Sequence, residues 1–534
     1  MTMSGSIASG RARTLGALLL LAVIPVVFMY GKTRLAEARG PLWLGSNSDP
    51  SYAYLLNALQ LAESGTVVHV DHPGTTAQAA GAVILLWSRM GKSAESWIQS
   101  VLERSEDHLE VIVALANAGT AGVLFFGGWF LYRRLDNLGL ALLAQGPSVV
   151  FSLSHVYAAT WFAPELFFPA IGFALSCVCF VGLREGGHSL WLAWWAGVLS
   201  GLGLFNKMTF LPYMALGILC FPRRSLVIFL AGFASTFLLW LCAVWGQMHY
   251  FVGWVAKLTL HSGKWGEGSA GVVDVRSYPC DLANLLTSDP LYLPLLILGV
   301  LLPAIWFFRR PSGARNEGRE FRALLGLTLM NVFSFLLVAK HSAPHYLVPM
   351  VSLAPLGVLL ICSGLQSLSA GRLRAAWLAF LLLPGLAASV PGFHHEVSRL
   401  EARHAEEIGL LQAARSYAEG IPEPSPQIVF FYRASSPEYA LMFGNIYSNR
   451  RYADTLSRLH PHALFFDPWA KTYEIFSGPL KPEVINRQNS DVILVGSQDL
   501  GHDGSGGAFP VPPGGRLREV LRTGVGGVYC VERE

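Results

Sequence analysis

The stretch SNSDPSYAYLLNALQLAESGTVVHVDHPGTTAQ, residues 46–78, is the segment around which this sequence is organised. It follows one apolar run and precedes all the others, and it contains two aspartates, two histidines and two prolines. A segment this polar does not cross a bilayer, because unpaired polar groups are costly in hydrocarbon. We therefore expect a polar loop held at a membrane surface by the apolar run before it.

The overall composition is that of a polytopic membrane protein. Of the 534 residues, 52% are hydrophobic and 14% are charged, whereas soluble domains are about 25% charged. The net charge of +4 is small and gives no reason to expect nucleic acid as a partner. The seven cysteines form no CxxC or Cys/His metal pattern, and most lie in apolar runs, where cysteine packs as a small hydrophobic residue.

Eleven apolar segments are near the length of about 17 to 25 residues that a helix needs to cross a bilayer. We interpret the first as a retained span, because bulky Phe28, Met29 and Tyr30 leave no cleavage site for a signal peptidase. The segments lie near residues 15–30, 109–132, 138–154, 164–183, 190–205, 208–222, 226–245, 291–308, 322–339, 345–362 and 375–392.

The arginines indicate how these spans are oriented. Basic residues favour the cytoplasmic side of a membrane protein. With eleven spans and a cytoplasmic amino terminus, loops 31–108 and 246–290 and everything after about residue 392 lie outside. All the arginine clusters then fall inside; they are Arg133 and Arg134, Arg184, Arg223 and Arg224, Arg309 to Arg319, and Arg372 and Arg374.

The last part of the chain is of a different kind. A charged helical segment at 394–419 is followed by short apolar runs at 428–433, 463–467, 491–496 and 527–532, separated by helical or loop sequence. This alternation predicts an α/β domain. We expect a transmembrane domain of residues 1–392 and an extracytoplasmic soluble α/β domain of residues 393–534. The latter has no glycine-rich phosphate loop, which favours a cover or an acceptor-binding module over a second catalytic unit.

Cys280 and Cys530 are the cysteines that this topology places outside, where disulfides form. The sequence gives no distance between the two residues, so a disulfide and two unrelated thiols both stay open.

The predicted topology brings four polar groups to the outer membrane boundary. Ionisable residues at this depth are costly unless they are paired or hydrated, so they are candidate site residues. They are Asp49, His69, Asp71 and His72 in the first loop, Lys207 at a turn between spans, His261, Lys264 and Glu267 in the second long loop, and Lys340, His341, His345 and Tyr346 near the end.

Carboxylates facing cations beside lipid suit a particular chemistry. A partly desolvated carboxylate accepts the proton of an attacking hydroxyl, and Lys or His stabilises the charge on a departing phosphate. This set fits group transfer from a lipid-linked phosphate. A transporter or flippase for a lipid-linked glycan or similar amphiphile stays open as the alternative, although transporters often show broken helices and related halves, and we detect no internal repeat.

The order of short motifs resembles the GT-C glycosyltransferase superfamily, and in particular its bacterial protein O-mannosyltransferase and aminoarabinose-transferase types. The resemblance covers residues 12 to 392. Asp49 and Tyr52 in SDPSYAY are similar to the family's Asp-Glu-x-x-Tyr motif, and Asp71-His72-Pro73 is similar to a later basic-Pro-Pro segment. GLGLFNK, ending at Lys207, and HYLVP, starting at His345, are similar to two later basic motifs of the family.

The resemblance implies a bacterial inner (plasma) membrane enzyme that transfers a sugar, with inversion, from a polyprenyl-phosphate-linked donor to a glycan, lipid or protein acceptor. It implies Asp49 as the base. Position 50 is Pro where many relatives have Glu, so Asp71 is the candidate second acid. The candidate substrate-binding residues are Tyr52, His72, Lys207, His261, Lys264, Lys340, His341, His345 and Tyr346. Two aspartates with nearby histidines also suit a divalent metal, although no spacing requires one.

Each candidate also has a plain structural interpretation. Asp49 before Pro50 is a favoured helix N-cap, and Asp71-His72-Pro73-Gly74 is a good turn sequence. Lys207 is also suited to extending its amine to the interface. The remaining cations are also typical of an ordinary outer loop. Both interpretations stay open at this stage.

Overall fold

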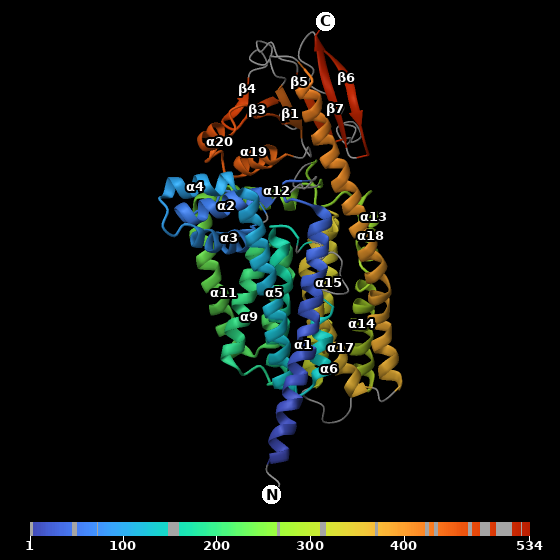
Figure 1. The fold of residues 1–534 in the computed structure, drawn as a ribbon. Helices are drawn as coiled ribbons and strands as arrows, with labels where there is room; N and C mark the ends of the chain where they lie inside the picture. The colour runs from blue at the N-terminus through green and yellow to red at the C-terminus, as the bar shows by residue number, and fades with distance from the viewer. Residues whose placement is uncertain are drawn as a thin grey trace.

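The computed structural model describes residues 4–44, 51–71, 73–147, 158, 160–263, 268–309, 317–368, 372–421, 427–431, 436–467, 472–480, 492–497, 515–524 and 526–533. Long helices run side by side as a bundle, and a β-sheet lies at the end of the bundle away from the amino terminus (Figure 1). Short helices lie between the bundle and the sheet, and they belong to the polar first loop.

Six helical segments in the described part of the chain are long and apolar enough to cross a bilayer, and one bent pair makes a possible seventh. The six contain α1 (Ser4–Arg39), α5 (Ser105–Leu135), η1 (Pro164–Phe167) with α8 (Phe168–Arg184), α11 (Arg223–Val244) with η3 (Trp245–Gln247) and α12 (Met248–Leu260), α14 (Tyr292–Arg309) and α15 (Glu317–Ala339). The bent pair consists of η5 (Pro344–Leu347) with α16 (Val348–Ser352), and α17 (Ala354–Leu368).

The predicted count of eleven spans stays a prediction. Two of the predicted spans are shorter apolar helices, namely α9 (Leu190–Asn206) and η2 (Met208–Ala215) with α10 (Leu216–Cys220). The span expected at 138–154 begins as α6 (Leu138–Gln145) and continues beyond the described residues. The span expected at 375–392 lies in α18 (Arg372–Glu419).

Glycines allow α9 and α11 to cross at close range. A Cβ atom added at Gly197 of α9 would lie 2.0 Å from the carbonyl oxygen of Phe229, and one added at Gly232 of α11 would lie 2.3 Å from that of Trp194. Small residues at a crossing let two membrane helices approach until their backbones touch. This packing fixes the position of the last turn of α9, which carries Asn206 and leads into Lys207.

The first loop forms three short helices, α2 (Ser51–Ser64), α3 (Thr75–Ser88) and α4 (Ala94–Glu103), across the end of the bundle (Figure 1). Ten consecutive residues of α2, from Ser51 to Gln60, are buried. A helix that is buried on all sides is covered from above as well as below. The first helix of this polar loop is therefore an internal element of the protein.

The carboxyl-terminal part forms one seven-stranded sheet in the order β4-β3-β2-β1-β5-β7-β6. β1 pairs in parallel with β2 and β5, and the outer pairs are antiparallel. The four apolar runs expected to be strands form β1, β2, β5 and β7. The strands are β1 (Gln427–Phe431), β2 (Leu464–Asp467), β3 (Thr472–Ile475), β4 (Gly478–Leu480), β5 (Val492–Ser497), β6 (Gly515–Arg522) and β7 (Gly526–Arg533), and the helices after β1 are α19 (Pro437–Tyr447) and α20 (Ala453–Leu459).

One continuous helix joins the bundle to the sheet. α18 has 48 residues, which corresponds to about 70 Å at 1.5 Å per residue. It runs from the amino-terminal end of the bundle up to the sheet (Figure 1) and contacts β1, β5 and β7. The boundary that we expected between residues 392 and 393 therefore falls inside a helix and not in a linker.

The two cysteines that were expected outside lie in different settings. Cys280 is exposed on α13 (Tyr278–Thr287), and Cys530 is buried in β7. Both are free thiols in this structure.

Candidate active site

A buried ion pair lies where α8 begins and α9 ends. The Lys207 ammonium contacts the Glu165 carboxylate, and the side chains of Lys207 and Glu165 are only 2% and 10% exposed. Pro164 starts the short helix η1, which places Glu165 in its first turn. At Lys207 the backbone leaves the helical conformation and becomes extended. Two helix ends that are 42 residues apart in sequence therefore place opposite charges together.

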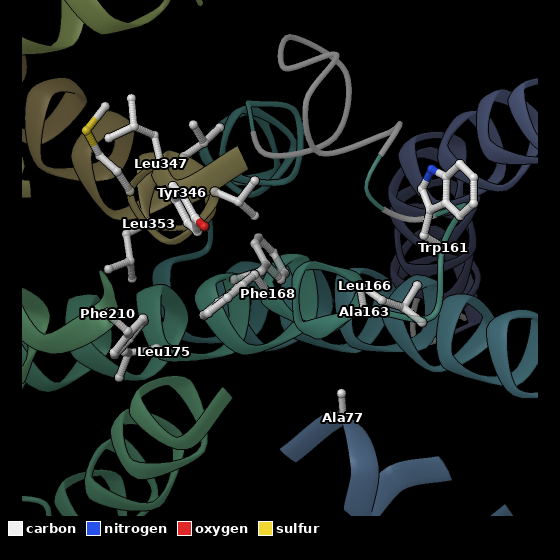
Figure 2. Packing of buried hydrophobic residues seen from close by; sticks show 14 of the residues in the cluster. Ala77, Trp161, Ala163, Leu166, Phe168, Leu175, Phe210, Tyr346, Leu347 and Leu353 are labelled. Carbon is white, nitrogen blue, oxygen red and sulfur yellow. The ribbon is translucent and has the colours of Figure 1, made fainter. Parts of the chain in front are cut away.

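The late HYLVP motif lies directly over this pair. The Lys207 amine is 4.4 Å from the centre of the Tyr346 ring, which is the geometry of a cation–π contact. The neighbouring His345 is exposed, and its ring centre lies 4.2 Å from that of Tyr346. Tyr346, Phe168 and Phe210 belong to the apolar cluster shown in Figure 2. The pair is thus enclosed on the bundle side, and an exposed imidazole lies near it.

The turn after Asp71 docks on the same place. The Gly74 amide donates to the carbonyl oxygen of Asn206 at 3.1 Å, and the Thr76 hydroxyl donates to the Leu202 carbonyl oxygen at 2.8 Å. Gly74 has a φ of +57°, which glycine adopts without steric cost. A side chain there would also collide with Tyr54, since a Cβ atom would lie 2.7 Å from its ring. The first loop is therefore fixed three residues after Asp71 to the residue before Lys207.

Asp71 itself faces α12. The Asp71 carboxylate lies near the Tyr250 hydroxyl of α12, and Asp71 is half-buried. Because a phenol donates only one proton, the carboxylate keeps other acceptor positions available for a second donor. The structure thus brings the turn that carries Asp71 to the end of α9 beside Lys207, while the Asp71 side chain contacts α12.

His69 connects this loop to the carboxyl-terminal part. Its ring packs edge-on against Tyr54 at 5.3 Å and against Tyr447 of α19 at 4.6 Å between ring centres. The Asn57 side-chain oxygen accepts from the His69 amide at 2.9 Å, and the Gln78 side chain donates to the His69 carbonyl oxygen at 2.9 Å. His69 is buried, so it acts as a packed link between α2, α3 and α19.

Tyr52, which was expected to bind substrate, lies in a different cluster. Its hydroxyl donates to Glu106 at 2.9 Å, and Glu106 also accepts from the Leu42 amide. Burial, together with the nearby Glu106 carboxylate, raises the pKa of Tyr52 far above its ordinary value, so the phenol stays protonated. Arg39 lies at 4.6 Å over the Trp161 ring and donates to the Thr160 carbonyl oxygen. This cluster ties the end of α1 to α2 and α5.

Three further candidates gather at the ends of α12 and α15. The Lys340 amine donates to the Thr259 carbonyl oxygen at 3.0 Å, two residues before His261. His261 is half-buried, and its Nδ1 atom lies 3.2 Å from the Gly268 carbonyl oxygen. His341 is also half-buried. The Lys340–Thr259 hydrogen bond joins the ends of α12 and α15 at the end of the bundle that lies near the sheet (Figure 1).

Asp49, His72 and Lys264 lie outside the described residues. In the part of the chain that the structure describes, no three His, Cys, Asp or Glu side chains gather as metal ligands. Of the four first-loop candidates for a metal site, Asp71 and His69 are among the described residues, whereas Asp49 and His72 are not. A divalent metal stays an open expectation from the sequence.

The sequence did not indicate Glu165 or Asn206 as site residues. Glu165 stands in WFAPELF, where a carboxylate within apolar sequence after a proline was the available signal. Its importance depends on Lys207, which is far away in sequence. Asn206 was part of the motif that ends at Lys207, but its neutral side chain carries no charge that would mark it.

Two solved structures are similar to this chain. One is the crystal structure of ArnT from Cupriavidus metallidurans bound to undecaprenyl phosphate, with 13% sequence identity, a TM-score of 0.45 and coverage of 97% of this chain and 98% of that one. The other is ArnT from Cupriavidus metallidurans in the apo state, with 12% identity, a TM-score of 0.48 and the same coverage. No family model and no curated protein matches the sequence.

Proposed function

We propose that this protein is a membrane glycosyltransferase that moves a sugar from a polyprenyl-phosphate-linked donor to an acceptor hydroxyl at the extracytoplasmic end of the bundle. The observation that carries the proposal is the hydrogen bond from Gly74 to Asn206, which fixes the Asp71 turn beside the buried Lys207–Glu165 pair. Carboxylates from the first loop and cations from later helices are the groups that this reaction needs in one place.

The proposed reaction is a single displacement with inversion. A first-loop carboxylate, Asp49 or Asp71, takes the proton of the acceptor hydroxyl as its oxygen bonds to the anomeric carbon. The bond from that carbon to the phosphate oxygen breaks on the opposite face, and the electron pair leaves with the polyprenyl phosphate. The phosphate gains one negative charge in this step, and stabilising that charge lowers the barrier.

Lys207 is suited to stabilise the leaving phosphate. An ammonium has three N–H donors, so its contact with Glu165 leaves others for a phosphate oxygen. The Glu165 carboxylate pairs with Lys207 and orients its side chain in a buried position, where an isolated ammonium is costly. His345, which is exposed beside Glu165, is suited to meet the phosphate on its solvent side.

The first experiment identifies the donor. Purified protein in lipid nanodiscs is incubated with a panel of polyprenyl-phosphate sugars, and loss of each donor is followed with and without a chelator. We expect one or a few donors to be consumed. A chelator-sensitive rate assigns a divalent metal to the reaction, and transport of the lipid across a bilayer without consumption of any donor contradicts the proposal.

The second experiment tests the base. Asp49→Asn is compared with Asp136→Asn, a matched change in an exposed aspartate that pairs with Arg13 near the amino-terminal end of the bundle. We expect Asp49→Asn to lose turnover but keep its fold and its lipid binding, whereas Asp136→Asn keeps all three. A transporter would tolerate Asp49→Asn and fail on substitutions deep within its spans.

A further inference from the structure

The buried amide of Asn206 has one atom that has no partner among the described residues. Asn206 is fully buried, and its Nδ2 atom donates to the Pro164 carbonyl oxygen at 2.5 Å. A carbonyl oxygen only accepts hydrogen bonds, so the amide nitrogen must face Pro164 and the orientation of the side chain is fixed. Across the described residues, the Oδ1 atom of Asn206 has no hydrogen-bond partner.

Several buried amide oxygens of the described residues have no partner, and the one on Asn206 belongs to the residue next to Lys207 in the chain. A buried polar atom without a partner costs about 1–3 kcal/mol, so most buried polar atoms are paired. Two hydrogen bonds hold Asn206 in place. Its main-chain oxygen accepts from the Gly74 amide, and its side-chain amide donates to the carbonyl oxygen of Pro164, which precedes Glu165. The unpaired oxygen therefore belongs to a residue that lies between the Asp71 turn and the ion pair.

The surrounding atoms indicate the chemistry of the missing partner. It must carry an N–H or O–H donor, because Oδ1 only accepts. The next residue is the buried Lys207, whose ammonium favours an anionic oxygen. The Thr209 hydroxyl, two residues further on, is another buried polar atom that has no partner among the described residues. A ligand with hydroxyls close to a phosphate meets all of these requirements.

We propose that Asn206 is a donor-binding residue whose Oδ1 atom accepts a hydrogen bond from one hydroxyl of the sugar next to the lipid phosphate. This inference rests on the proposed function and adds a specificity determinant to it. A site built to receive a hydroxyl rejects the analogue that lacks it, because the buried acceptor is then left unpaired. Asn206 would therefore select donors by one hydroxyl position.

The test is a thermodynamic cycle between the residue and the ligand. Binding to nanodisc-embedded protein is measured for the polyprenyl-phosphate hexose that the wild type binds best and for its monodeoxy analogues. We expect one deoxy position to weaken binding to the wild type about 5- to 10-fold. In the Asn206→Leu variant, removal of the same hydroxyl should not change the affinity, because the interaction is already lost.

Gln145→Leu is the matched control. Gln145 is also a fully buried amide, its nitrogen is held by the carbonyl oxygens of Leu21 and Leu124, and its side-chain oxygen has no partner in the described part of the chain. It lies between α1, α5 and α6, away from Lys207. We expect Gln145→Leu to lose as much affinity as the wild type when the same hydroxyl is removed from the ligand.

Three results would overturn the inference. A wild type that binds all deoxy analogues equally has no such hydroxyl contact, and this measurement stands even if Asn206→Leu does not fold. An Asn206→Leu protein that keeps the full deoxy penalty places the contact elsewhere. A wild type that binds polyprenyl phosphate but none of its sugar-linked forms contradicts the proposed function first, and the role of Asn206 falls with it.

Discussion

The Lys207–Glu165 pair is the residue-scale feature on which the site depends. Bringing two charges into a low-dielectric environment is costly, and removing one partner leaves the other charge uncompensated. Such a pair is poor evidence of selection for stability alone, because apolar residues of similar size often serve as well. Its presence beside the first loop therefore favours a role in the chemistry.

Single and double substitutions separate stability from function at this pair. We expect Lys207→Met and Glu165→Gln each to destabilise the protein by about 3–5 kcal/mol, since each leaves a lone buried charge. The double variant should recover much of the lost thermal stability and remain inactive. Thermal unfolding and donor turnover, both in nanodiscs, check this. A fully active double variant would show that the pair serves packing only.

Glu407 of α18 gives a pH dependence with a definite sign. It is buried, and burial raises the pKa of its carboxyl despite the hydrogen bond from Arg403 at 2.8 Å. A carboxyl whose pKa is higher in the folded protein than in the unfolded chain contributes its full stabilisation at pH values below its ordinary pKa. This stabilisation is lost as the pH rises through the folded-state pKa. The wild type should therefore lose stability relative to Glu407→Gln between about pH 4 and neutrality.

Melting temperatures of the two proteins across this pH range test the prediction. The difference between them should grow as pH rises. A constant difference would mean that Glu407 titrates as an ordinary exposed carboxyl, and a difference that shrinks would mean that Arg403 dominates the environment of the carboxylate.

At the residue scale, the sequence could identify lone charges but not their partners. Lys207 stood out because it interrupts apolar sequence, and the structure places it among buried side chains. The interpretation in which its amine reaches the interface does not match a side chain that is 2% exposed. Glu165 was missed because pairing over 42 residues depends on how α8 and α9 pack, which a local pattern does not contain.

At the scale of elements, the contact between α2 and α19 joins the first loop to the sheet. Glu63 of α2 accepts from Arg451 at 3.0 Å and from the Tyr452 hydroxyl at 3.4 Å. The Asn57 side chain donates to the Tyr447 carbonyl oxygen at 3.0 Å. The position of the first-loop helices is thus linked to that of α19, and through Tyr447 to His69, two residues before Asp71.

Gly444 of α19 is the closest point of this contact. A Cβ atom there would lie 2.7 Å from the Tyr52 carbonyl oxygen, and backbone at that distance must shift. We expect Gly444→Ala to separate the two helices, lower stability by about 1–3 kcal/mol and reduce turnover. Faster hydrogen exchange in α2 and α19 would identify the site of the change.

Gly409→Ala is the control for this prediction. It is the same substitution at another helical glycine, with nothing within 4 Å of the added Cβ atom. It should leave the protein unchanged or slightly more stable, because alanine is the better helix former. If both variants behave alike, the contact between α2 and α19 has no mechanical role.

The strands of the sheet were predictable from sequence, but the docking of the sheet was not. Short apolar runs between turns are local signals, and four of them form β1, β2, β5 and β7. The Glu63–Arg451 contact joins residues 388 positions apart and has no local signal. For the same reason, the sequence did not indicate that one helix, α18, continues through the expected domain boundary at residue 392.

At the scale of the whole molecule, the polar elements gather at one end of the bundle. The first-loop helices, the Lys207–Glu165 pair and the sheet are linked in series through Asn206, Gly74, His69 and Tyr447. The amino terminus lies toward the other end (Figure 1). The orientation in which the arginine clusters lie inside stays a prediction from the positive-inside pattern.

The most direct test of the account is the rate of donor consumption by Asp71→Asn and Asp136→Asn proteins in liposomes, with polyprenyl-phosphate binding measured in parallel. We expect Asp71→Asn to bind the lipid normally and to react about 10²- to 10⁴-fold more slowly, while Asp136→Asn matches the wild type. A normal rate for Asp71→Asn, with Asp49→Asn equally active, would show that the first-loop carboxylates do not carry out sugar transfer.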